Sequence, residues 1–230
     1  MFKFILILTL FHSTSIAEEK NRPLNDKLQS RRQKANQKRP DKVKKVMENQ
    51  NMDLLKSGIL DTAIKKGVAV PNFSLEGKKI SDFYRNKNII LKFYRGGWCP
   101  YCMIELKEYQ GLYNRIKKSG CDLIGIAPDT KKEILKTKKR HSLEFPIYSD
   151  QDNKIAKMFG IAFTLNNDLV SVYEKFGIDL KKSQDNSSNQ LPLPGTYVVN
   201  RKGKIIYAFA DIDYTKRAEP TEVLSYCFQK

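Results

Sequence analysis

Apolar positions along most of the chain alternate between strand-like runs and helix-like stripes. The pattern begins near residue 67 and is punctuated by glycine, proline and short polar turns. The predicted elements are, in order, a hairpin over 70–80, a strand over 89–94, a helix over 102–118, a strand over 122–127, a helix over 130–141, extended chain over 145–149, a helix over 153–159, a strand pair over 196–200 and 204–210, and a helix over 219–228. Alternation of this kind indicates an α/β fold.

Two stretches lack this alternation. Residues 166–189 are polar, and within them 185–189 has the composition of a flexible insertion. Residues 18–50 have too little apolar surface to fold alone. Apolar positions then recur at three- and four-residue steps over 43–64, interrupted at 49–51, which predicts two short helices packed on the main domain.

The first residues have the pattern of an export signal. Lys3 precedes a short apolar run, and Ser15 and Ala17 occupy the small-residue positions of a cleavage site. The run is shorter than the about 20 residues that span a bilayer. We therefore expect a signal peptide over 1–17, a basic extension, helical in part and otherwise disordered, over 18–66, a single domain over 67–230, and a periplasmic or extracellular location.

The chain is strongly basic, with 42 Lys and Arg against 25 Asp and Glu and a net charge of +17. Only ten of the basic residues are Arg, and the lysines are spread through the whole chain. Phosphate recognition favours clustered Arg, so the charge indicates a solvated surface rather than a nucleic-acid site. Contact with an anionic membrane would be weak and sensitive to salt.

Cys99 and Cys102 lie where a predicted strand passes into a predicted helix. Unpaired N–H groups and the helix dipole at such a position stabilise a thiolate, and the partner thiol can trap it as a disulfide. A structural disulfide, half of a zinc site and two buried thiols are the alternatives. The chain has no second C-x-x-C and no C-x-x-H to complete a zinc site, so the pattern favours redox chemistry.

The remaining cysteines are Cys121, at the start of a predicted strand, and Cys227, near the carboxyl end. Sequence alone does not place two sulfurs within bridging distance. We therefore favour two separate buried thiols over a Cys121–Cys227 disulfide.

Three separated motifs resemble the bacterial peroxiredoxin-like proteins of the alkyl hydroperoxide reductase and thiol-specific antioxidant (AhpC/TSA) family. They are the segments 93–102, 191–199 and 213–220, and the resemblance covers about residues 53–229. It implies a thioredoxin-like fold, in which a central mixed β-sheet is flanked by helices. It implies no metal or organic cofactor.

The resemblance also implies roles for individual residues. Cys102 falls at the peroxidatic position, with Glu105 in the following C-x-x-E position. In a thioredoxin alignment Cys99 would attack and Cys102 would resolve. Pro194 matches the thioredoxin-fold proline that usually follows a cis peptide bond and faces the two cysteines, and Thr196 follows it in the same motif.

This chain departs from the family pattern at three positions. Arg95, Cys99 and Pro194 stand where peroxiredoxins keep a proline, a threonine and an arginine. Arg95 is either a cation near the thiolate or a solvated charge. Trp98 and Tyr101 either cap the site or only pack beside it.

The expected function is an antioxidant one, in which peroxide is reduced through a Cys99/Cys102 disulfide cycle. Cys102 attacks, Cys99 condenses with the sulfenic acid, and an external dithiol such as a thioredoxin-like protein regenerates the thiols. One alternative is a thioredoxin-like reductase or oxidase of protein disulfides. The non-enzymatic alternative is a copper(I)-binding protein.

Overall fold

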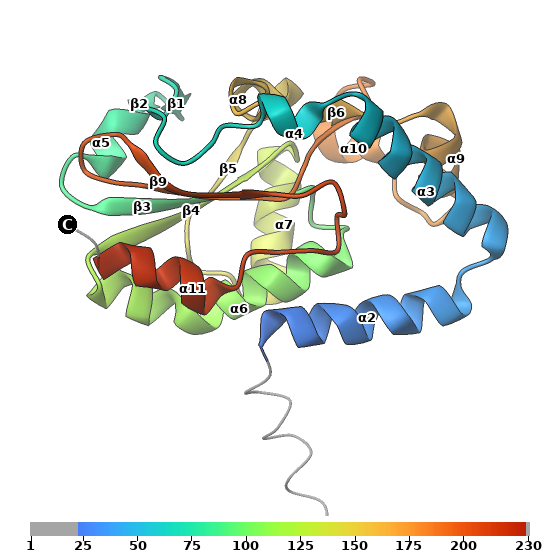
Figure 1. Cartoon of the computed structure of the whole chain (residues 1–230), viewed down its shortest axis with the longest axis horizontal. Helices are drawn as coiled ribbons and strands as arrows, with labels where there is room; N and C mark the ends of the chain where they lie inside the picture. Colours follow the sequence, from blue (N-terminus) through green and yellow to red (C-terminus); the bar gives the residue numbers. More distant parts are fainter. Residues whose placement is uncertain (1–22, 229–230) are drawn as a thin grey trace, which may run out of the picture.

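Five strands form the central sheet in the computed structural model, which describes residues 23–228 (Figure 1). Their spatial order is β5 (Ile147–Ser149), β4 (Cys121–Ala127), β3 (Asn88–Phe93), β8 (Gly195–Val199) and β9 (Ile205–Ala210). β3 runs parallel to β4 and β4 parallel to β5, whereas β8 is antiparallel to both β3 and β9. The sheet is therefore mixed, as predicted.

Helices cover both faces of this sheet. In Figure 1, α6 (Pro100–Lys118), α11 (Pro220–Ser225) and α2 (Leu24–Lys38) lie below the sheet, while α5 (Ile80–Tyr84) and α8 (Lys154–Met158) lie above it. All six residues of β3 are buried, because both faces are covered. Successive side chains of a strand point to opposite faces, so Ile90, Lys92 and Tyr94 face α6. The fold class is confirmed.

The other elements lie around this core. They are α3 (Asp41–Lys56), α4 (Ile59–Thr62), β1 (Ser74–Leu75), β2 (Lys78–Lys79), α7 (Lys131–His141), η1 (Gln151–Asn153), β6 (Ala162–Thr164), α9 (Asn167–Lys175), α10 (Leu180–Gln184), β7 (Gln190–Pro192) and η2 (Tyr226–Phe228). The predicted hairpin over 70–80 exists, but its two strands are only two residues long each.

The polar stretch 166–189 is more regular than predicted, because it contains α9 and α10. Side-chain caps start both helices: Asn166 Oδ1 accepts from Leu169 N at 2.9 Å, and Asp179 Oδ1 accepts from Lys182 N at 2.8 Å. Their few apolar side chains form a small core of their own. Its buried members are Leu165, Leu169, Val172, Tyr173, Leu180 and Leu191.

The N-terminal extension is also more ordered than predicted. α3 is one helix through residues 49–51, where a break was expected, because the Gln50 side chain is buried and its Oε1 accepts from Asn166 N at 2.7 Å. α2 packs on α6 through Leu24 and Leu28, and Lys27 Nζ lies 2.7 Å from Glu108 Oε1. The extension therefore folds against the domain; its boundary at residue 66 stays a prediction.

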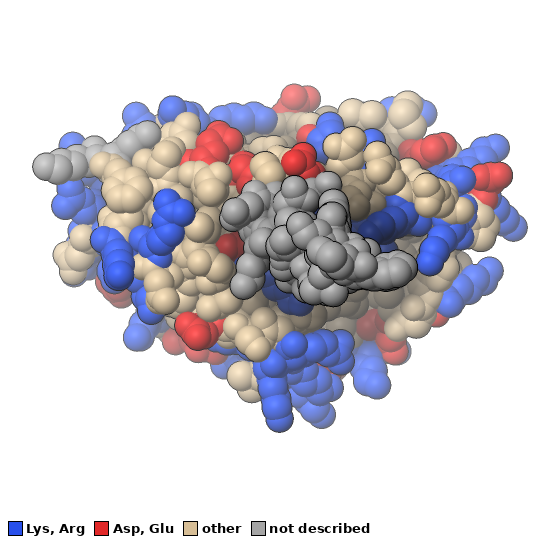
Figure 2. All heavy atoms as spheres, turned by 90° about the horizontal axis from the view of Figure 1, so that it is seen from below, with Lys and Arg blue, Asp and Glu red and all other residues tan. Residues whose placement is uncertain are grey.

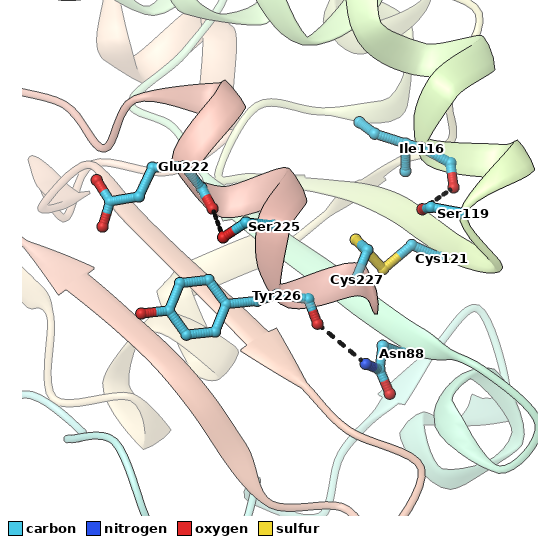
Figure 3. Close-up of a disulfide and its surroundings, with 8 residues drawn as sticks. All are labelled: Asn88, Ile116, Ser119, Cys121, Glu222, Ser225, Tyr226 and Cys227. Carbon is cyan, nitrogen blue, oxygen red and sulfur yellow. Dashed lines mark hydrogen bonds between the residues drawn. A yellow bond between two sulfur atoms is a disulfide. The ribbon is translucent and has the colours of Figure 1, made fainter. Parts of the chain in front are cut away.

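Cys121 and Cys227 form a disulfide, so the interpretation as two separate thiols is wrong (Figure 3). Their Cα atoms lie 5.6 Å apart although 106 positions separate them in the sequence. The sheet and η2 create this proximity, since Asn88 at the start of β3 donates from Nδ2 to Tyr226 O at 3.2 Å. The bridge attaches the C-terminal segment to the start of β4.

The predicted signal peptide over 1–17 lies outside the described residues. Within residues 23–228, no helix is both long and apolar enough to cross a membrane. Lys and Arg side chains occur at many separate places on the face drawn in Figure 2, with Asp and Glu between them. This distribution agrees with a solvated basic surface, while the absence of a nucleic-acid partner stays a prediction.

Candidate active site

The two C-x-x-C sulfurs lie in the first turn of α6. Cys99 is the N-cap residue, its carbonyl accepts from Met103 N at 3.0 Å, and Pro100 starts the helix. Cys102, Glu105, Leu106 and Tyr109 follow at helical spacing and form the buried stripe that faces β3. Both thiols are free and buried, with 1% exposure at Cys99 and 0% at Cys102.

The approach to this turn requires glycine at position 97. A Cβ atom there would collide with the Thr137 side chain of α7, so only glycine lets the backbone pass. Gly97 N donates to Asp129 Oδ2 at 2.8 Å, which fixes the loop in front of Cys99. The close approach to Thr137 and the hydrogen bond to Asp129 therefore both fix the backbone just before α6.

Glu105 is fully buried between two cations. Its Oε1 lies 2.9 Å from Lys92 Nζ and its Oε2 accepts from Arg217 Nε at 2.6 Å. Lys92 also donates to Gly195 O at 3.0 Å and to Thr196 Oγ1 at 3.1 Å. Glu105 and Thr196, both expected near the site, are thus joined through Lys92, a residue that the sequence analysis did not single out.

Arg217 connects this network to the sulfurs. Its Nη2 lies 3.5 Å from Cys102 Sγ, and its Nη1 donates to Lys216 O at 2.6 Å and to Tyr214 O. Arg217 belongs to the 213–220 motif, but the sequence analysis gave it no role. The guanidinium places a positive charge beside Cys102, whereas the sequence analysis considered only Arg95 as a cation near the thiolate.

Arg95 is buried rather than solvated, with 3% exposure. Its guanidinium lies over the rings of Trp98, Tyr173 and Tyr214, at 5.2, 5.7 and 4.7 Å from their centroids, and Nη2 donates to the Tyr173 hydroxyl. Tyr101 packs edge-on against Tyr214 at 5.4 Å. The aromatic residues around the C-x-x-C therefore enclose a cation.

The two sulfurs differ in the direction in which their surroundings shift the thiol pKa. Burial opposes a charge on Cys99, but the hydrogen bond with Cys102, the charges of Arg95 and Arg217 and the Cys102 backbone N–H lower the pKa of Cys99 to about 6. Burial, together with the hydrogen bond to Cys99 and the charge on that sulfur, raises the pKa of Cys102. The pair therefore holds its first negative charge on Cys99.

The described residues contain no cis peptide bond, so the prediction of a cis bond before Pro194 is wrong. Pro194 instead lines a pocket together with Arg95. In this chain it precedes β8, whose Gly195 pairs with Phe93 of β3 and whose Gly195 carbonyl accepts from Lys92. The segment is thus fixed by sheet pairing and by the buried lysine.

Asp129 is a further residue of the site that the sequence analysis did not single out. It is 1% exposed, and its Oδ1 has no hydrogen-bond partner among the described residues. Burial raises the pKa of Asp129 to about 7, against the lowering effect of the Gly97 N–H. In the sequence, the Pro128-Asp129 pair after β4 was the signal that could have pointed to this residue, but the same pair is also common at an ordinary helix start.

Residues 23–228 contain no group of three or more His, Cys, Asp or Glu side chains placed to hold a metal ion. The two thiols, with Arg95, Arg217, Lys92 and Glu105 around them, are an arrangement that suits thiolate chemistry: two sulfurs one helical turn apart, and basic side chains that would stabilise negative charge on either sulfur.

Among curated proteins, the chain is similar to the chloroplastic peroxiredoxin Q of Triticum aestivum, with 29% identity over 157 residues, 66% of this chain and 62% of that protein. It is 26% identical over 103 residues to peroxiredoxin Bcp of Escherichia coli, covering 43% of this chain and 65% of that protein. The chain thus spans about six-tenths of the length of such relatives.

These relatives contradict the predicted periplasmic or extracellular location, since those from wheat, rice and poplar are named as chloroplastic. The prediction rested on residues 1–17, which contain no Asp or Glu. Export signals and organelle transit peptides share this lack of acidic residues, so the first residues alone do not separate the two.

Solved structures agree with the fold. Peroxidoxin BcpB from Mycobacterium tuberculosis has a TM-score of 0.54 at 18% identity, covering 70% of this chain and 95% of that one. Mycobacterium bovis AhpC has a TM-score of 0.52 at 17% identity, covering 70% and 89%. A family model described as "AhpC/TSA family" matches residues 66–208, more than half of the chain. The chain therefore belongs to the AhpC/TSA family.

Proposed function

We propose that this protein is a thiol-dependent peroxidase whose redox pair is Cys99 and Cys102. The observation that carries the proposal is the place of Cys99 at the N-cap of α6, one helical turn from the free thiol of Cys102. Burial opposes a charge there, but the hydrogen bond with Cys102 and the charges of Arg95 and Arg217 lower the pKa of Cys99 to about 6. A thiolate is the nucleophile that attacks a peroxide bond. Family membership and the named peroxiredoxin relatives support the same chemistry.

The reaction begins at Cys99. Its thiolate attacks one oxygen of the peroxide, an S–O bond forms, the O–O bond breaks, and the departing oxygen takes up a proton as water or an alcohol. The resemblance assigned this attack to Cys102. The electrostatics favour Cys99, because burial and the neighbouring thiolate raise the pKa of Cys102.

The second step joins the two sulfurs. The Cys102 sulfur attacks the sulfenic sulfur of Cys99, the S–O bond breaks, water leaves, and a Cys99–Cys102 disulfide forms. An external dithiol, such as a thioredoxin-like protein, then supplies two electrons and two protons and is itself oxidised to a disulfide. Arg217 next to Cys102 Sγ stabilises the charge that this sulfur carries when it attacks.

Thiol–disulfide exchange with a protein disulfide is the second candidate function. The position of Cys99 as the N-cap of α6 favours it, because a thiolate at a helix start can also attack a disulfide sulfur. In that reaction Cys102 would resolve a mixed disulfide between Cys99 and the partner. The two functions share the order of attack and differ in the substrate.

Rapid mixing of the reduced protein with hydrogen peroxide and, separately, with a disulfide substrate tests the proposal. Fast oxidation by peroxide is expected. The Cys102→Ser variant should stop at a sulfenic acid on Cys99 that a specific probe labels, whereas Cys99→Ser should lose the fast reaction.

A Cys121→Ala/Cys227→Ala variant is the control for unrelated thiol effects. Labelling on Cys102 in Cys99→Ser, with none in Cys102→Ser, would reverse the order of attack. If the wild type reacts rapidly with the disulfide and slowly with peroxide, the second function replaces the first.

A further inference from the structure

Lys92 is a buried lysine with no part in the reaction steps of Cys99 and Cys102. It lies within β3, where every residue is buried, and its side chain has no exposed surface. Lysine is almost never fully buried unless it is paired. Because even a paired buried charge loses its hydration, an apolar residue at this position would stabilise the fold as well or better. Packing therefore does not explain the charge.

The surroundings of Lys92 suit its charged form. Three oxygen atoms lie within 3.1 Å of Nζ: Glu105 Oε1 at 2.9 Å, Gly195 O at 3.0 Å and Thr196 Oγ1 at 3.1 Å. Three acceptors match the three N–H donors of an ammonium group. Burial lowers the pKa of Lys92, and the charge of Glu105 opposes this effect. The geometry is that of a lysine held as a cation.

A continuous chain of charged groups joins Lys92 to a sulfur. Glu105 Oε2 accepts from Arg217 Nε at 2.6 Å, and Arg217 Nη2 lies 3.5 Å from Cys102 Sγ. Glu105 Oε1 has no hydrogen bond within residues 23–228, so the Lys92 ammonium is the group that offsets its charge. Two cations and one carboxylate leave a net positive charge next to Cys102.

We propose that Lys92 sets the reduction potential of the Cys99–Cys102 disulfide by balancing the charge of Glu105, so that the charge of Arg217 acts on the Cys102 sulfur. This inference rests on the proposed redox pair and adds a positioning residue that regulates its oxidising strength. Without Lys92, the carboxylate would neutralise the guanidinium, and a negative charge on Cys102 would be stabilised less.

The charge matters when the disulfide is reduced. A thiolate of the external dithiol attacks the Cys99 sulfur, the bond between the two sulfurs breaks, and Cys102 leaves with the electron pair as a thiolate. The second thiol of the dithiol loses its proton and attacks the mixed disulfide, which releases Cys99 and oxidises the dithiol to a disulfide. The two protons of the dithiol pass to the released sulfurs or to water. A cation beside Cys102 stabilises the departing thiolate and thus favours the reduced pair.

Two substitutions of similar size should shift the potential in opposite directions. Lys92→Met removes a positive charge and should lower the equilibrium constant for reduction by glutathione by about tenfold, which corresponds to about 30 mV. Glu105→Gln removes a negative charge and should raise this constant by about tenfold. The double variant Lys92→Met/Glu105→Gln keeps the charge of Arg217 and should lie within about threefold of the wild type.

The measurement is the oxidised fraction of the Cys99–Cys102 pair in glutathione buffers of known composition. Differential alkylation followed by mass mapping of the peptides reports this pair separately from the Cys121–Cys227 disulfide. Unfolding of each variant in denaturant, measured alongside, separates a change in potential from a loss of stability.

Lys87→Met and Glu108→Gln are the matched controls. They make the same exchanges in partly exposed ion pairs, where Lys87 Nζ lies 3.0 Å from Asp122 Oδ2 and Glu108 Oε1 lies 2.7 Å from Lys27 Nζ. Solvent and salt screen such pairs, so both variants should keep the equilibrium constant within about twofold of the wild type.

Opposite shifts in the two single variants, with the double variant near the wild type, support the inference. Shifts in the same direction, or a loss of stability without a change in potential, would overturn it and leave Lys92 a structural residue. If Lys92→Met does not fold, Glu105→Gln and the double variant decide, because they differ only at Lys92. A wild type that forms no reversible Cys99–Cys102 disulfide would refute the proposed function, and this inference with it.

Discussion

Arg217 and Glu105 form an ion pair with no exposed side-chain surface, in which Nε donates to Oε2 at 2.6 Å. Lys92 Nζ lies 2.9 Å from the other oxygen of Glu105, and the site also holds Arg95 and the buried carboxyl of Asp129, whose pKa burial raises to about 7. Isolated buried charge is unfavourable, so an excess of positive charge favours an anionic sulfur in the same enclosure. The ion pair thus links the stability of the domain to the ionisation of Cys99.

The first prediction concerns the ionisation of the reduced pair. In Cys102→Ser, which keeps a hydroxyl to donate to Cys99, the pKa of the remaining thiol should lie below the ordinary value of a free cysteine. In Cys99→Ser the remaining thiol should titrate above the ordinary value of a free cysteine, because Cys102 is buried. The pH dependence of alkylation rates measures both, and a reversed order would contradict the assignment of the thiolate to Cys99.

The second prediction concerns Arg217→Met. Removal of one partner of a buried ion pair should cost about 3–5 kcal/mol of unfolding free energy. It should also raise the pKa of Cys99 by about one unit or more, because a nearby cation is lost. Arg32→Met is the matched control, since Arg32 pairs with Asp213 at 3.2 Å but is 51% exposed.

Arg32→Met should cost less than about 1 kcal/mol and leave the titration of Cys99 unchanged. Denaturant unfolding and alkylation profiles measure the two effects. Equal losses of stability in both variants would mean that the Arg217–Glu105 pair has no special role. If Arg217→Met loses stability but the pKa of Cys99 does not change, the Arg217–Glu105 pair stabilises the fold and has no effect on the thiol.

The sequence predicted most of the sheet because its strands are long apolar runs with clear limits. It also predicted that Cys99 and Cys102 lie at the start of a helix, which depends only on local spacing, while their function as a redox pair stays a proposal. The elements α9 and α10 were missed because only a few apolar residues, such as Leu169 and Leu180, separate their pattern from that of a polar loop. Their stability comes from side-chain caps and from contacts with one another and with α3.

The rest of the site depends on contacts between residues far apart in the chain. Lys92 interrupts the apolar run 89–93 of β3, and this was the available signal that it meets a buried carboxylate. Arg217 and Glu105 lie 112 positions apart, and Cys121 and Cys227 lie 106 apart. No pattern along the chain reports such distances, so single-sequence reasoning had no physical basis for pairing them.

The third prediction concerns the Cys121–Cys227 disulfide. Its replacement by two alanines should destabilise the protein by about 2–5 kcal/mol, because the bridge closes a long loop in the unfolded chain. Alkylation of Cys99 should not change, since this thiol lies at the other end of α6 from Ser119 and Cys121. Denaturant unfolding of both forms measures the effect. Equal stability of the bridged wild type and the double variant would show that the bridge is dispensable.

The last prediction uses the buried Asp129, whose pKa of about 7 lies above the ordinary value of an aspartate. Between about pH 4 and pH 7 the folded protein keeps this proton while the unfolded chain releases it. The folded state then binds more protons, so this group lowers the stability of the protein as the pH rises. This destabilisation is absent below about pH 4, where both states keep the proton, and it is complete above about pH 7.

Asp129→Asn removes the titration but keeps an oxygen that can accept from Gly97 N. The unfolding free energy of the variant relative to the wild type should therefore increase by about 2–3 kcal/mol between pH 5 and pH 8, at about 1.4 kcal/mol per pKa unit. The exposed Asp168 gives the control variant Asp168→Asn, whose relative stability should stay within about 0.5 kcal/mol. Parallel pH profiles for wild type and Asp129→Asn would mean that Asp129 is ionised in the folded protein throughout this range.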